Sequence, residues 1–295
     1  MNGIALIAVP YEVSRLRDGM GRGPEQLLAS GAAEALGAAG AIVATEVVEL
    51  TGKFSNEIEA CFELIRLVRG RVDAALGEGA FPVVLSGSCC FAALGVMAAM
   101  DESAPGVVWF DAHGDFNTPE TTTRGYFDGM GLAVLTGSAW QGMLRTVPGA
   151  KPLPESAIVL AGARDFDDDE ACRLRDSEIK HLPAERIVSD EALDGAMAAV
   201  VPEPTALYLH VDLDVLDLEQ EGPVNIYSAP GGITAEQLAS RVEQVLRTGS
   251  VRAVALTAYD PECDAEGRVP PIANRLLRAV AGVAGRGDGS PHQDT

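Results

Sequence analysis

Short apolar runs alternate with longer amphipathic or alanine-rich segments along this chain. The apolar runs are residues 4–9, 82–85, 106–110, 157–160, 206–211 and 251–256. The longer segments include residues 24–36, 56–76, 91–100, 190–200 and 235–248. Short buried strands that alternate with helices are typical of βαβ units, whose right-handed crossovers place helices on both faces of one parallel sheet. The pattern therefore predicts an α/β fold with ligand-binding loops at the carboxyl ends of the strands.

No internal repeat and no proline- or serine-rich linker divides the chain, so we expect one domain over residues 1–285. Residues 286–295 contain glycine and proline without apolar periodicity, which predicts a loose tail. The uncharged stretch 79–100 has the length of a membrane span, but Pro82, Gly87 and Gly95 interrupt it. We interpret this stretch as a buried strand, a turn and a helix.

The composition limits which classes of binding partner and which cellular compartment we expect for this protein. With 43 acidic and 22 basic residues, the formal net charge is −21, which argues against nucleic acid and against an anionic membrane. The five cysteines form neither CxxC pairs nor an even disulfide framework. The amino terminus lacks a cationic region before its apolar stretch. We therefore expect a cytoplasmic protein that binds neither nucleic acid nor a membrane.

Two clusters of metal-binding residue types follow predicted strands. Asp111, His113 and Asp115 come directly after residue 110, whereas Asp212 and Asp214 follow the strand 206–211 and share a face. Acids at strand ends often serve as turn residues and helix caps. Four carboxylates at neighbouring strand ends, however, would raise one another's pKa values unless cations lay among them. The sequence therefore predicts a site for two divalent ions, with Mn²⁺ favoured by carboxylate and imidazole ligands.

In combination, these motifs resemble the arginase, or ureohydrolase, family of binuclear manganese amidinohydrolases. The likeness covers nearly the whole chain and includes the early loop with Gly21, Gly23 and Pro24. It implies a three-layer α/β/α fold with a mainly parallel sheet, and two bound Mn²⁺ ions. It also implies hydrolysis of a guanidino carbon by a metal-bridging hydroxide, and a homo-oligomer, either a trimer or a hexamer.

The resemblance further implies roles for single residues. Asp115 would be both a metal ligand and a catalytic residue that orients the hydroxide and passes its proton to the leaving amine. Asp167 takes the place of an aspartate that reads the substrate α-amino group, and Asn117 matches a contact to the α-carboxylate. Arg124 lies in a loop where many members carry a small polar residue. It could clamp a substrate carboxylate in bidentate fashion or point into solvent.

Three positions depart from the family's pattern. Cys89 stands where the family's first metal ligand is a histidine. As a ligand it would hold Mn²⁺ weakly or select a different metal, and it could instead be a buried small hydrophobe or a nucleophile. Asp128 replaces a histidine thought to shuttle protons, and we expect it to relay a proton in that place. Ala258 replaces a glutamate that binds the guanidinium group, which changes which substrate is favoured.

These departures favour a modified substrate. We expect a metal-dependent hydrolase that cleaves a C–N bond in a guanidino or modified guanidino amino acid, for example an N-hydroxyguanidino compound. A hydroxyguanidine is less basic than a guanidine and can bind a metal through its oxygen. The alternative is a non-catalytic arginase-like protein that uses the family's substrate pocket to bind a small molecule or a partner protein. Against that alternative stands the cost of crowding five metal-ligand side chains together without a cation.

Overall fold

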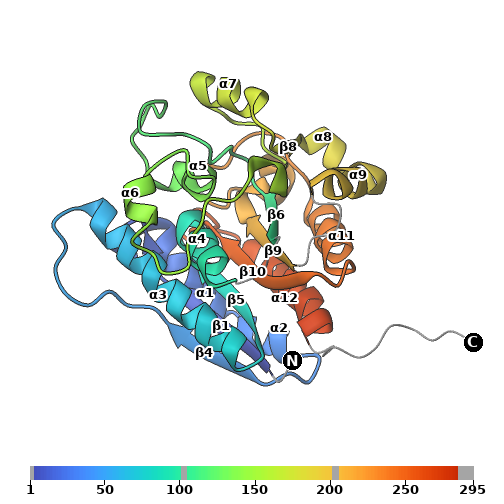
Figure 1. Ribbon diagram of the computed structural model, residues 1–295. Helices are drawn as coiled ribbons and strands as arrows, with labels where there is room; N and C mark the ends of the chain where they lie inside the picture. Colours follow the sequence, from blue (N-terminus) through green and yellow to red (C-terminus); the bar gives the residue numbers. More distant parts are fainter. Residues whose placement is uncertain (1–2, 101–104, 201–205, 285–295) are drawn as a thin grey trace, which may run out of the picture.

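The computed structural model describes residues 3–100, 105–200 and 206–284 and contains an eight-stranded sheet (Figure 1). Its strand order is β4-β1-β5-β10-β9-β6-β7-β8, and every neighbouring pair is parallel. The six predicted strands are confirmed as β1 Gly3–Val9, β5 Ala80–Ser86, β6 Pro105–Phe110, β7 Ile158–Ala161, β9 Ala206–Asp212 and β10 Val251–Thr257. A short antiparallel hairpin joins β2 Tyr11–Glu12 to β3 Arg15–Leu16.

The sequence pattern missed the two edge strands, β4 Val43–Val47 and β8 Lys180–Leu182. Most of their side chains are exposed, because an edge strand has a neighbour on one side only. Neither strand therefore carries the apolar run by which the central strands were found.

The predicted helices are present, with one correction. Four of them are α3 Glu57–Gly77, α4 Cys89–Ala99, α9 Asp190–Val200 and α11 Ala235–Leu246. The helix expected over 24–36 is two helices, α1 Gly23–Ala29 and α2 Ala32–Gly37. Gly31 separates them with a φ of 96°, a left-handed conformation that ends the first helix. The short helices are α5 Gly131–Leu135, α6 Gln141–Leu144, α8 Ala184–Ile187 and α10 Leu218–Glu221.

Like the short helices, two longer ones were not predicted from the sequence. Helix α12 Val269–Ala284 begins with Pro270 and Pro271 in its first turn, where proline is tolerated, and buries Leu276 and Leu277 against the sheet. Helix α7 Asp168–Asp176 follows Asp167 and has a strongly acidic first turn.

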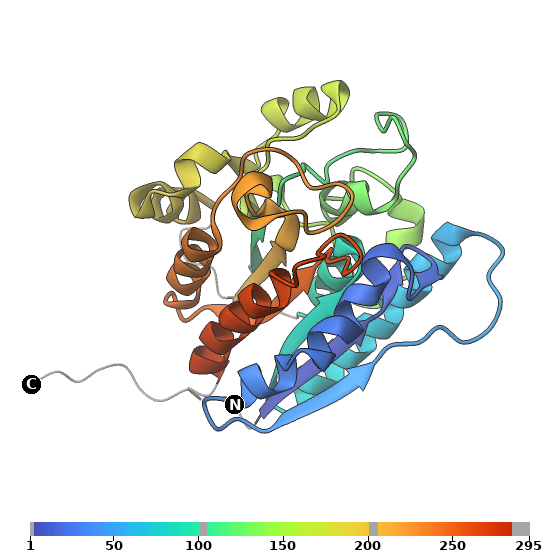
Figure 2. The same ribbon diagram turned by 180° about the vertical axis from the view of Figure 1, so that it is seen from behind.

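Helices cover both faces of the sheet, as Figures 1 and 2 show from opposite sides. Helices α3, α4, α5 and α6 pack on one face, whereas α1, α2, α9, α11 and α12 pack on the other. Along β6, the side chain of Trp109 packs into the core on the face covered by α3 and α4, and that of Phe110 packs into the core on the opposite face. Successive side chains of a strand point to opposite faces of the sheet, so this alternation is expected. The predicted three-layer α/β/α architecture is therefore confirmed.

The described residues cover only part of what was predicted about the uncharged stretch, the domain boundaries and the C-terminal tail. The stretch 79–100 consists of β5, a turn and α4, as expected. Among the residues that the structure describes, no helix combines the length and the apolar composition needed to cross a membrane. The single domain over 1–285 stays a prediction, and the tail 286–295 lies outside the described residues.

Candidate active site

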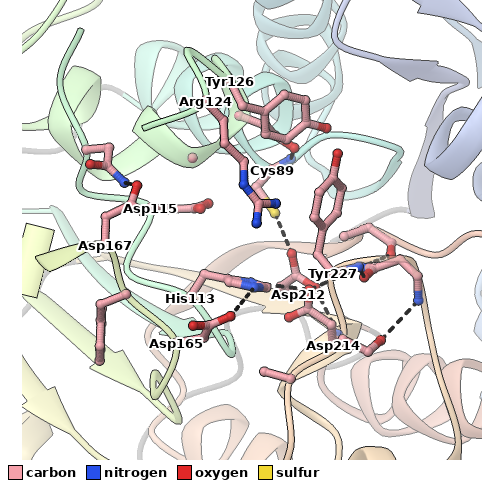
Figure 3. A pocket seen from close by; sticks show the side chains of 18 of the residues that line it. Cys89, His113, Asp115, Arg124, Tyr126, Asp165, Asp167, Asp212, Asp214 and Tyr227 are labelled. Carbon is pink, nitrogen blue, oxygen red and sulfur yellow. Dashed lines mark hydrogen bonds and ion pairs between the residues drawn. The ribbon is translucent and has the colours of Figure 1, made fainter. Parts of the chain in front are cut away.

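The topology places four strand ends side by side at the centre of the sheet. Strands β5, β10, β9 and β6 are consecutive neighbours, and because all are parallel their carboxyl ends share one edge. The residues that follow these ends line a cavity of about 380 Å³. Figure 3 shows Cys89, His113, Asp212 and Asp214 directed toward one another there. The clusters that the sequence places far apart therefore meet at one site.

Asp111 and His113 form the part of the site that follows β6. Asp111 is fully buried, and its carboxylate accepts hydrogen bonds from Trp109 Nε1 at 2.8 Å and from the His113 backbone at 2.7 Å. His113 Nδ1 lies 3.4 Å from an oxygen of Asp111 and 3.4 Å from an oxygen of Asp214. Burial lowers the pKa of His113, but the charges of Asp214 and Asp111 outweigh it and raise that pKa far above its usual value.

Asp212 and Asp214 form the part that follows β9. Asp212 accepts a hydrogen bond from the Asp214 backbone at 2.9 Å, whereas Asp214 accepts one from Asn225 Nδ2 at 3.1 Å. Burial, together with the charges of Asp214 and Asp111, raises the pKa of Asp212 well above its usual value. Burial also acts to raise the pKa of Asp214, but His113 outweighs it and the pKa falls to about 2.

Asp115 completes the cluster from the loop after β6. Its backbone has a φ of 47°, in the left-handed region that non-glycine residues seldom occupy. This turn brings its side chain back toward the strand end, and the side chain lines the cavity. Burial raises its pKa well above the usual value, and the charges of Asp111 and Asp128 add to the shift.

Cys89 is the first residue of α4 and is buried. Its sulfur lies 2.9 Å from Asp212 Oδ2, to which it donates, and 3.1 Å from Thr257 Oγ1. Burial and the charge of Asp212 raise the pKa of the Cys89 thiol well above its usual value. These two polar contacts distinguish Cys89 from a side chain that only fills apolar space.

The donor atoms fit two adjacent cations. One group consists of Cys89, Asp111 and Asp115, and the other of Asp111, His113 and Asp214, with the ligand atoms in each group within 4.8 Å of one another. Asp111 belongs to both groups, and Asp212 contacts the Cys89 sulfur directly. Burial, together with the charges of neighbouring acids, raises the pKa of three carboxyl groups, those of Asp111, Asp115 and Asp212, and a cation would reverse such a shift. The residues present therefore fit a binuclear site with one softer, sulfur-containing end.

Asp128 lies at the amino terminus of α4 and is buried. Its two carboxylate oxygens accept hydrogen bonds from the backbone N–H groups of Cys89 at 3.1 Å and Cys90 at 2.9 Å. Burial raises the pKa of Asp128 to about 6, although these hydrogen bonds act to lower it. The residue expected to relay protons thus also holds the start of the helix that carries Cys89.

The residues expected to bind the amino-acid end of a substrate lie together at another wall of the cavity. Asn117 Nδ2 donates to Asp167 Oδ2 at 3.2 Å, and Thr123 Oγ1 donates to Asp167 Oδ1 at 2.9 Å. Arg124 is exposed at the cavity rim and points into the cavity (Figure 3). Within the described part of the chain, its guanidinium makes no hydrogen bond or ion pair. It is therefore free to meet an anion.

Ala258 lines the cavity at the end of β10 and is buried. Its carbonyl accepts a hydrogen bond from Asn225 Nδ2 at 2.7 Å. The methyl side chain brings no charge to this wall, where the family resemblance leads one to expect a carboxylate.

Sequence reasoning missed several residues that shape the site. Glu170 is buried and accepts hydrogen bonds from the backbones of Phe116 at 2.8 Å and Asp167 at 3.3 Å, and burial raises its pKa to about 7. The spacing of Asp167 and Glu170 is that of a capping box, a signal by which Glu170 could have been found in the sequence.

Arg164 was also missed and holds several loops of the site together. It donates to carbonyl oxygens of the loops after β7 and β9 and of the loop 229–230; the acceptors are Gly162, Asp214, Val215, Leu216, Ala229 and Pro230.

Comparison with known proteins agrees with this geometry. The chain is 25% identical to the arginase of Bacillus caldovelox over 297 residues, which cover 96% of this chain and 99% of that protein. The solved structure of that arginase matches with a TM-score of 0.85 at 24% identity, over 98% of this chain and 100% of the other. An N(omega)-hydroxy-L-arginine amidinohydrolase of Streptomyces lavendulae is 32% identical over 167 residues, 55% of each protein. The model of the arginase family matches residues 2–282. The chain therefore belongs to the arginase family.

Proposed function

We propose that this protein is a metal-dependent amidinohydrolase that cleaves a C–N bond of an N-hydroxyguanidino amino acid. The observation that carries the proposal is the uncharged wall at Ala258, which lines the cavity beside Cys89. A guanidinium ion needs an anionic partner when it is desolvated, whereas a less basic hydroxyguanidine can enter in its neutral form. The likeness to a relative named as an N(omega)-hydroxy-L-arginine amidinohydrolase supports the same substrate class.

The proposed metal ligands are Asp111, His113, Asp115, Asp212, Asp214 and Cys89, with Mn²⁺ as the expected ion. Two bound divalent ions would lower the pKa of water and stabilise the negative charge that develops during hydrolysis. Because one ligand group contains the Cys89 sulfur, that end of the site would hold Mn²⁺ more weakly or prefer a softer metal.

Asp115 is the proposed acid–base residue. It lines the cavity among the proposed metal ligands, so its carboxylate is placed to orient the attacking hydroxide and to pass its proton to the leaving amine. Asp128 is the proposed proton relay, with a pKa of about 6. Its two oxygens are engaged with the backbone of α4, so relaying a proton would require one of these hydrogen bonds to open.

Recognition of the amino-acid end falls to Asn117, Asp167 and Arg124. Asn117 and Thr123 hold the Asp167 carboxylate in place, which prepares it to accept hydrogen bonds from an α-ammonium group. Arg124 reaches into the cavity from its rim and can pair with the α-carboxylate. Opposite charges at the two positions would orient a zwitterionic amino acid with its side chain toward the metal ligands.

The test is product formation by the purified, Mn²⁺-loaded protein. N-hydroxyarginine, arginine, agmatine and formiminoglutamate are offered separately, and amine products such as ornithine are quantified. We expect N-hydroxyarginine to give the highest kcat/KM. Ala258→Glu should shift the preference toward arginine, whereas Ala198→Glu on the exposed surface of α9 should leave it unchanged.

Two outcomes would contradict the proposal. If arginine is the best substrate of the unchanged protein, the argument from the uncharged wall is wrong. If no guanidino compound is hydrolysed and no Mn²⁺ is retained, the non-catalytic alternative takes its place.

A further inference from the structure

A buried polar chain leads from the protein core to the sulfur of Cys89. Tyr208 Oη lies 2.7 Å from His210 Nδ1, and His210 Nε2 lies 3.2 Å from Thr257 Oγ1. Thr257 Oγ1 lies 3.1 Å from Cys89 Sγ, which in turn donates to Asp212 Oδ2 at 2.9 Å. None of these five side chains is more than 4% exposed. Their protons must therefore be satisfied within the protein.

Tyr208 determines the direction of this chain. A phenol buried in the core has to donate its proton, and within the described residues His210 Nδ1 is its acceptor. Nδ1 is then unprotonated, and the single N–H of the neutral imidazole is on Nε2. That N–H points at Thr257 Oγ1, which accepts it. The ring of His210 is held in this orientation by stacking on Trp109, with ring centroids 3.8 Å apart.

Thr257 is left with its own hydroxyl proton and two acceptors. One is the Cys89 sulfur at 3.1 Å, and the other is the Val211 carbonyl oxygen at 3.4 Å. An O–H···O hydrogen bond is usually 2.7–2.8 Å long. The carbonyl is therefore distant for an oxygen acceptor, whereas 3.1 Å is a close approach to the larger sulfur atom. The threonine proton is directed to Cys89.

We propose that Tyr208, His210 and Thr257 are positioning residues that deliver a hydrogen bond to the sulfur of Cys89 and so prepare it to serve as a thiolate metal ligand. The ligand role of Cys89 rests on the proposed function. Before a metal binds, the thiol proton is donated to Asp212, and the metal would replace that proton. The hydrogen bond from Thr257 then stabilises the negative charge that remains on a sulfur with little access to water.

Co²⁺ is the probe for this proposal, because a cobalt–thiolate bond has a charge-transfer absorption band. Thr257→Val keeps the branched shape that suits a central strand and removes the hydroxyl, which donates to Cys89 and accepts from His210. We expect the band to move to longer wavelength and the Co²⁺ affinity to fall by about 10- to 100-fold. Thr257→Ser should restore both values, and Thr136→Val, at the residue that follows α5 and away from the cavity, should alter neither. An unchanged band and affinity in Thr257→Val would overturn the proposal.

The metal-free protein supplies an independent measurement. Nitrogen-15 NMR of His210 should show a protonated Nε2 and an unprotonated Nδ1, and Tyr208→Phe should weaken that preference. A protonated Nδ1 in the unchanged protein would contradict the direction of the chain. If Co²⁺ does not bind at all, the proposed metal-dependent function fails. The direction of the hydrogen-bond chain from Tyr208 to Cys89 is then tested by the His210 tautomer alone.

Discussion

Two buried acids that are not among the proposed metal ligands predict an unusual pH dependence for the stability of the metal-free protein. Burial raises the pKa of Glu170 from 4.5 to about 7 and that of Asp128 from 3.8 to about 6, even though backbone hydrogen bonds oppose both shifts. At 1.36 kcal/mol per pKa unit, each difference corresponds to about 3 kcal/mol. Together they amount to about 6 kcal/mol, which is comparable to the whole stability of many domains.

The sign follows from proton binding. Between its unfolded and folded pKa values, each acid keeps a proton in the folded protein that the unfolded chain has already released. Raising the pH through that window, about 4 to 6 for Asp128 and about 4.5 to 7 for Glu170, therefore lowers the free energy of unfolding. Below both windows this contribution is fully present. The growing repulsion within a chain of net charge −21 acts in the same direction.

The assay is urea unfolding of chelator-treated protein, followed by tryptophan fluorescence, at several pH values between 4 and 8. We expect these two acids to contribute a fall of about 6 kcal/mol to the free energy of unfolding across this range. Glu170→Gln should remove about half of the fall, whereas Glu219→Gln, at an exposed position in α10, should leave it intact. With Mn²⁺ present the loss should be offset at higher pH, because metal ligands bind in their deprotonated forms. A pH dependence that is the same in Glu170→Gln as in the unchanged protein would refute the reasoning.

Four further predictions follow from the site. Cys89→His should tighten Mn²⁺ binding, measured by calorimetry, because imidazole suits this ion better than a thiol does. Asp167→Asn should raise KM for an amino-acid substrate by about 10-fold or more with little change in the thermal midpoint, since it removes a charged partner of the α-ammonium group. Asp128→Asn should remove the Asp128 share, about 3 kcal/mol, of the fall in the free energy of unfolding between pH 4 and 7, because an amide carries no charge to bury. If Asp128 also relays protons, the acid limb of the kcat profile should disappear in that variant. Light scattering should find the predicted trimer or hexamer; a monomer would contradict it.

The centre of the fold could be predicted from the sequence because the central strands are buried on both faces. Their uninterrupted apolar runs, such as 206–211, identify them without knowledge of their neighbours. The edge strands β4 and β8 could not be found in this way, since their stability comes from pairing with β1 and β7 rather than from their own side chains. The break at Gly31 was also missed, because a single glycine within a helical pattern does not reveal its φ.

The residues of the candidate site also fall into those that could be predicted from the sequence and those that could not. Asp111, His113, Asp212 and Asp214 could be placed because they directly follow strands, and parallel neighbours bring their ends together. Glu170 reaches the site through the loop and helix after β7, and no local pattern reports that its carboxylate binds the Phe116 backbone. The partners of Asp128 are backbone N–H groups 38 and 39 residues away, which have no signature in the sequence at all.

The contacts of Cys89 bear on the three interpretations that its residue type alone leaves open, namely metal ligand, buried hydrophobe and nucleophile. A cysteine at a helix amino terminus usually gains thiolate character from the free N–H groups there. Here Asp128 already occupies the N–H groups of Cys89 and Cys90, and its negative charge offsets the helix dipole. Burial then raises the pKa of the Cys89 thiol instead of lowering it, so the side chain lacks what a nucleophile needs. On the proposal above, a thiolate forms at this position when a cation is bound, with the hydroxyl of Thr257 as donor. The acid at 128 and the cysteine at 89 would then act as one arrangement, in which the charge of the sulfur depends on the metal.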